Sequence, residues 1–110
     1  MNTAQLVRII IAKDFSDTPG GRYRSDGAAS GEEFREFQLK PKFLNAQREG
    51  TILEIDLDGA EGYATSFLEE AFGGLAREYG AQSVLKTLKF TCADEPLLIR
   101  EIESYISSAK

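Results

Sequence analysis

Short apolar segments with two different periodicities alternate along this chain, and this alternation most constrains its fold. Residues 6–12 form a β-branched apolar run that is typical of a strand buried on both faces. Residues 51–57 and 84–92 alternate apolar and polar side chains, as half-buried strands do. Apolar residues at helical spacing follow each of these segments or lie between them. Strands that alternate with helices predict right-handed crossovers and a mostly parallel sheet.

The first and the last of the predicted helices have recognisable start signals. Ser30 and Glu33 form a capping box, in which the serine hydroxyl accepts from a backbone N–H and the glutamate reaches back to the cap. Pro41 is expected to kink this first helix or to divide it in two. Asp94 is expected to cap the last helix, with Pro96 in its first turn, and an apolar stripe continues nearly to the C-terminus.

The longest apolar stripe predicts a helix over residues 66–79. Ser66 and Glu69 have the spacing of a second capping box at its start. Two adjacent glycines, at 73–74, lie inside this helix although glycine costs about 1 kcal/mol relative to alanine there. Close approach to the sheet or to a partner would explain them.

Together these elements predict an α/β fold. Residues 21–24 follow a Pro-Gly turn signal and are expected to return as a short additional strand. The expected architecture is one domain over residues 1–110, with a mixed, mostly parallel sheet of about four strands packed by three or four helices. One core is expected to contain Phe34, Ile55, Phe72, Leu75, Phe90 and Ile102.

Composition argues against several classes of function. The chain has no histidine and one cysteine, Cys92, so it lacks histidine-based catalysis, a Cys/His zinc site and an internal disulfide. A net charge of −5 opposes binding to a nucleic-acid backbone. No apolar run approaches a membrane span or an export signal. We therefore expect a cytoplasmic protein that is not an enzyme and uses no metal or cofactor, with no nucleic acid or membrane as partner.

Two groups of residues invite a ligand-binding interpretation. Asp56 and Asp58 end a predicted strand, where open α/β sheets bind ligands, and can hold a divalent cation. Residues 18–24 combine glycine amides with Arg22 and Arg24, which suits an anion. We interpret the first group as a solvated turn and the second as a hairpin turn with exposed arginines.

Several segments of the chain resemble one bacterial family. Residues 51–59 and 62–75 resemble the STAS-like domains of unknown function, and residues 14–16, 21–23 and 30–32 fit the same family. These segments are spread over nearly the whole chain. The resemblance implies a STAS-type α/β fold.

The resemblance also implies a regulatory role. STAS domains proper include anti-sigma factor antagonists, in which an aspartate-serine pair stands at a helix start and a histidine-kinase-like ATPase phosphorylates the serine. Ser66 falls at the matching place, whereas Thr65 stands where the antagonists have aspartate. We therefore expect a signalling module that binds a protein partner such as a histidine-kinase-like ATPase, with phosphoregulation at Ser66.

The expected contact residues lie around the start of the 66–79 helix. An alternative is a small-molecule or nucleotide-binding domain that uses the strand-end loop at Asp58 and the loop at residues 20–24. A protein-binding module should have an exposed, slightly apolar patch near that helix start, whereas a ligand-binding domain should have a concave polar pocket. The expected partner or ligand contacts are Arg22, Asp58, Tyr63, Thr65, Ser66 and Phe67.

Overall fold

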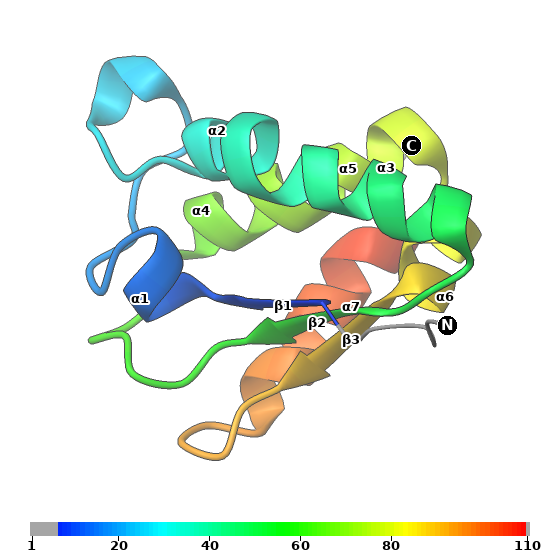
Figure 1. The fold of residues 1–110 in the computed structure, drawn as a ribbon. Helices are drawn as coiled ribbons and strands as arrows, with labels where there is room; N and C mark the ends of the chain where they lie inside the picture. The colour runs from blue at the N-terminus through cyan, green and yellow to red at the C-terminus, as the bar shows by residue number, and fades with distance from the viewer. Residues whose placement is uncertain (1–6, 110) are drawn as a thin grey trace.

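The fold is built on a three-stranded parallel sheet (Figure 1). The structure, a computed structural model, describes residues 7–109. Strands β1 (Val7–Ile10), β2 (Leu53–Asp56) and β3 (Leu88–Thr91) pair in the order β1-β2-β3. The α/β class is therefore confirmed. Within the described residues the sheet has three strands rather than about four, and it is parallel rather than mixed.

The first strand is shorter than the sequence predicts. Residue 6 of the expected strand lies outside the described residues, and Ile11 already belongs to a single helical turn, α1 (Ile11–Asp14). The carboxylate of Asp14 accepts a hydrogen bond from the Ile10 backbone N–H at 2.8 Å. This local bond favours the turn over a continued strand, as short acidic side chains often do.

One face of the sheet lies against the core and the other is polar. Ile9 and Ile55 are aligned in the strand register and are fully buried. Arg8, Glu54 and Lys89 are aligned one position earlier in each strand, so their side chains point to the other face of the sheet. Arg8 and Lys89 are exposed, and Arg8 forms a salt bridge of 2.6 Å with Glu54. The first strand is therefore half-buried, and the prediction that both of its faces are buried is wrong.

Two long helices pack on the core face, and each contains one turn of π-helix. In Figure 1 the first of them lies above the strands, and the second crosses behind it. Their segments follow one another without a break in helical backbone. The first long helix comprises α2 (Gly31–Phe34), η2 (Arg35–Leu39) and α3 (Lys40–Glu49), and the second comprises α4 (Thr65–Leu68), η3 (Glu69–Gly73) and α5 (Gly74–Tyr79).

The first long helix begins as the sequence predicts. The Ser30 hydroxyl accepts a hydrogen bond from the Glu33 N–H at 3.0 Å. Pro41 does not end the helix, because it follows the π turn and occupies the first turn of α3. A π turn is one of the recognised adjustments by which a helix accommodates irregular hydrogen bonding. Gly50, with a φ of 70°, then ends α3 in the left-handed conformation that glycine favours.

Two predicted strand segments are helical or irregular. Residues 81–87 form α6 (Ala81–Thr87), so only Leu88–Thr91 of the predicted 84–92 strand is extended. Residues 21–24 form no strand, because the Asp26 carboxylate accepts from the backbone N–H groups of Arg22 and Tyr23 and closes a turn. That turn leads into a short 3₁₀ helix, η1 (Arg24–Asp26).

The last helix, α7 (Leu97–Ser107), lies behind the sheet in Figure 1 and packs against the second long helix. None of the helices in the described part of the chain is long and apolar enough to cross a bilayer. The predicted core is confirmed, with Phe90 partly buried at its margin. Its fully buried members are Phe34, Ile55, Phe72, Leu75 and Ile102.

Candidate functional site

The loops that leave β2 and β3 are tied together at the carboxyl end of the sheet. The Asp58 carboxylate accepts hydrogen bonds from the backbone N–H groups of Ala93 and Asp94, at 2.9 and 2.8 Å. These bonds lower the pKa of Asp58. In return, Asp94 accepts from the Gly59 N–H at 3.4 Å. Asp94 therefore joins the loops, and its predicted role as the α7 cap is wrong, because α7 has no side-chain cap.

A pocket of about 170 Å³ lies beside these loops. Tyr63 lines it, and its hydroxyl donates a hydrogen bond of 2.8 Å to the Leu57 carbonyl oxygen. Burial raises the pKa of the Tyr63 hydroxyl, and burial also raises the pKa of the half-buried Cys92 thiol. Cys92 is consequently a neutral thiol at neutral pH, which does not favour nucleophilic chemistry. The pocket wall also includes the acidic residues Glu61, Asp94 and Glu95.

The second long helix begins two residues after Tyr63, which lines this pocket. Thr65 is exposed and Ser66 is half-buried in the first helical turn. Ala64 occupies the cap position without a side-chain hydrogen bond, so the predicted Ser66 capping box is wrong. Phe67 is 0% exposed, and its predicted place on a surface patch is wrong as well. Its ring packs against that of Tyr63, with centroids 6.1 Å apart, and thereby links the helix start to the core.

Arg22 belongs to a network of ion pairs rather than to a free loop. Its guanidinium lies 2.5 Å from Glu69 and 3.4 Å from Glu70. Arg77 lies 2.5 Å from Glu69, and Arg35 lies 2.6 Å from Glu70. Hydrogen bonds from Arg77 and Arg22 lower the pKa of Glu69. The network joins the loop before α2 to the second long helix across 47 residues of sequence.

The paired glycines of the second helix make room for this network. A Cβ atom on Gly74 would lie 2.6 Å from the Arg35 guanidinium, and one on Gly73 would lie 2.8 Å from the Glu69 carboxylate. A close approach therefore exists within the chain, and it is to side-chain ion pairs rather than to the sheet. Sequence reasoning missed the network, and the glycine pair was the signal for it.

The structure brings the predicted site residues into two neighbouring groups. Asp58 and Tyr63 belong to the strand-end loops beside the pocket. Ser66 precedes Glu69, the partner of Arg22, by three residues, a separation that places two side chains on the same side of a helix. Among the described residues, no three Cys, Asp or Glu side chains lie close enough to hold one metal ion.

The sequence model of one protein family matches residues 30–98 and is described as a STAS-like domain of unknown function (DUF4325). The chain belongs to this family. No curated protein and no solved structure matches the chain. The matched region includes residues 51–59 and 62–75, whereas residues 14–16 and 21–23 precede it.

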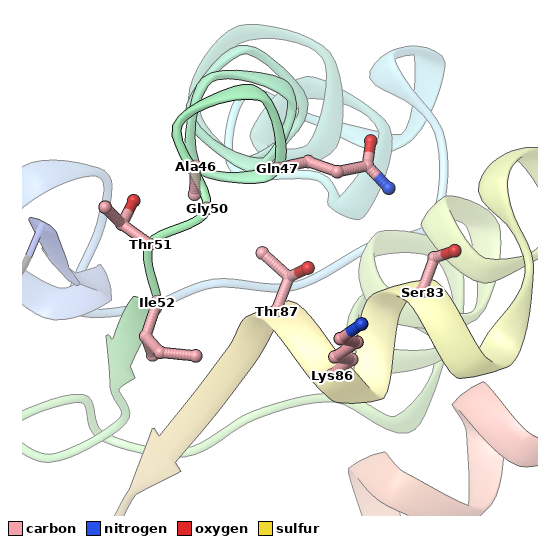
Figure 2. A pocket seen from close by; sticks show the side chains of 8 residues that line it. All are labelled: Ala46, Gln47, Gly50, Thr51, Ile52, Ser83, Lys86 and Thr87. Atoms are coloured by element: carbon pink, nitrogen blue, oxygen red, sulfur yellow. The ribbon is translucent and has the colours of Figure 1, made fainter.

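A second pocket, of about 280 Å³, lies where β2 and β3 begin, at the other end of the sheet from the strand-end loops. Figure 2 shows it from close by. It is formed by the end of α3, the residues that lead into β2, and α6. Sequence reasoning assigned no site residue there. The sequence did contain a signal, since Lys86 fell on the apolar face of the predicted 84–92 strand, and the helical turn instead exposes this lysine.

Proposed function

We propose that this STAS-like domain is a cytoplasmic regulatory module that binds a protein partner and is not an enzyme. The binding surface, here called the loop face, comprises residues 59–66 and 94–98. The exposure of the loop face supports this proposal. Glu61 and Thr65 are exposed, and the Leu97 side chain is 72% exposed. We assign Leu97 as the apolar contact of this surface, which the neighbouring charged groups would surround as a polar rim.

The loop face is acidic, which defines the kind of partner that fits. Glu61, Asp94 and Glu95 line its pocket, and Asp58 lies behind them. A basic side chain of the partner would enter this pocket, while an apolar side chain would cover Leu97. Complementary charge accelerates association and selects partners with a basic surface.

We further propose phosphoregulation at Ser66, with a histidine-kinase-like ATPase as the class of partner that the family resemblance suggests. Ser66 lies in the first turn of a long helix, where unpaired N–H groups favour negative charge. A phosphate there would compete with Glu69 for Arg22 and would make the loop face more acidic. It should therefore tighten binding of a basic partner.

The test begins with affinity purification of the tagged domain, followed by mass spectrometry and measurement of Kd for the partner. The double variant E61Q/E95Q should weaken binding at least tenfold, and Ser66→Asp should tighten it at least tenfold, or about 1.4 kcal/mol. Ser66→Ala should bind normally. Glu49→Gln is the control for loss of a carboxylate elsewhere, because Glu49 is exposed and ends α3 at the other end of the sheet. Equal affinities for E61Q/E95Q and Glu49→Gln would refute the loop face as the binding surface.

A second candidate function is small-molecule binding at the same pocket. The supporting observation is the concave, partly polar site at Tyr63. The burial of Phe67 also removes part of the apolar patch that was expected of a protein-binding surface there. At about 170 Å³ the pocket is below the range of roughly 300–1,000 Å³ that suits drug-sized ligands, which disfavours a nucleotide. Because Glu61, Asp94 and Glu95 line it, a small organic cation is the ligand that fits. Native mass spectrometry of the purified protein would detect such a ligand, and a mass equal to that of the bare chain would contradict it.

A further inference from the structure

The 280 Å³ pocket between α3 and α6 has a lining unlike the rest of this acidic protein. Figure 2 shows Ser83 and Thr87 rising from α6 toward the end of α3, with Gln47 reaching along the same opening. Lys86 is its single charged lining residue, and no carboxylate lines it. In a chain with a net charge of −5, this pocket therefore has one positively charged side chain and no negatively charged one in its lining.

Three hydroxyl groups accompany this cation. They belong to Thr51, Ser83 and Thr87, and Thr87 is 7% exposed, so its side chain is held in the pocket wall. Hydroxyl and ammonium groups together suit a ligand with negatively charged oxygen atoms. A few placed polar groups on a partly apolar wall are the usual composition of a small-molecule site.

Two backbone carbonyls at the end of α3 already accept hydrogen bonds from the backbone. The Ala46 carbonyl accepts from the Thr51 N–H at 2.9 Å, and the Gln47 carbonyl accepts from the Gly50 N–H at 3.4 Å. These two of the last four carbonyls of α3 thus already have donors, which removes part of the negative potential of the helix C-terminus. Lys86 is then available for an external anion.

The remaining lining determines the shape of the ligand. Ala46 and Ile52 supply an apolar wall, and Ile52 is 39% exposed. One cation matches one negative charge, and the volume lies just below the range for drug-sized ligands. We propose that this pocket binds a small monocarboxylate, whose carboxylate contacts Lys86, Ser83 and Thr87 and whose short carbon chain lies on Ile52. This site goes beyond the proposed function, because it lies at the other end of the sheet from the loop face.

The test is NMR titration of the ¹⁵N-labelled domain with sodium pentanoate, with pentan-1-ol and with inorganic phosphate. Pentanoate should cause saturable shifts in the amide signals of Ser83, Thr87 and Gly50. Pentan-1-ol lacks the charge and phosphate lacks the carbon chain, so each should bind at least tenfold more weakly.

Two variants and one control test the assigned contacts. Lys86→Met should weaken pentanoate binding at least tenfold, and Thr87→Val, which keeps the side-chain shape, should weaken it about threefold to tenfold. Lys89→Met removes the same charge from an exposed position on β3 and should bind as the unchanged protein does. Unsaturable shifts, equal binding by Lys86→Met and Lys89→Met, or phosphate or pentan-1-ol binding as tightly as pentanoate would each overturn the proposal.

Discussion

Replacing Gly74 by alanine sets two energetic effects of opposite sign against each other. Alanine gains about 1 kcal/mol of helix propensity over glycine. The added Cβ, however, would lie 2.6 Å from the Arg35 Nη1, which donates to the Glu70 carboxylate at 2.6 Å and to the Glu70 carbonyl at 2.7 Å. Both side chains are largely buried, at 13% and 10% exposure. Each hydrogen bond to a charged group contributes about 1.5–3 kcal/mol, so the loss should outweigh the gain.

We therefore expect Gly74→Ala to destabilise the protein by about 1–3 kcal/mol, measured by urea unfolding. The matched control is Gly73→Ala, whose Cβ would approach the more exposed Glu69 side chain and should cost less. In an Arg35→Met background, Gly74→Ala should lose most of its cost, because the displaced interaction is already gone. A stabilising effect of Gly74→Ala in the unchanged protein would refute this reasoning.

Two further predictions concern the core and the charge network. Phe72→Ala should destabilise by about 3–5 kcal/mol in urea unfolding, because the ring is fully buried; an unchanged midpoint would contradict the core assignment. Glu69 has a pKa below its ordinary value of 4.5 because of its bonds with Arg77 and Arg22, so its stabilisation is present above that value and is lost as pH falls through the lowered pKa. Urea unfolding at neutral pH should show Glu69→Gln to be less stable than the unchanged protein, and the difference in free energy of unfolding should narrow at pH values below 4.5. A difference that stays constant with pH would contradict the pairing.

The periodicity of apolar residues predicted most of the fold. The stripe over residues 66–79 matches a helix from Thr65 to Tyr79, because the same apolar side chains that define the stripe form its buried side. Residues 84–87 were misassigned because a four-residue segment can satisfy an alternating and a helical pattern at once. The helix there begins directly after Gly80, whose φ of 96° ends one helix and allows the next to start.

The functional surfaces were less predictable, since they depend on contacts between distant residues. Its place in a glycine-rich run makes Arg22 a candidate ligand contact, yet its partners Glu69 and Glu70 lie 47 and 48 residues away. The spacing from Ser66 to Glu69 predicts a capping box, but that glutamate bonds to arginines instead. Local patterns thus predicted which helix contains the candidate site, and long-range pairing determined what its side chains contact.

The charge network also indicates how the two long helices keep their relative position. Ion pairs removed from water are inefficient sources of stability, because desolvation offsets much of their attraction. Their value lies in geometry, since an arginine and a carboxylate satisfy each other only when correctly placed. Here Arg35 opens the π turn of one helix and Glu70 lies in the π turn of the other, at the point where Gly31 allows the two backbones to meet. We infer that the network fixes the register of this crossing and, through Arg22, anchors the preceding loop beside the helix that begins at Thr65 and contains Ser66.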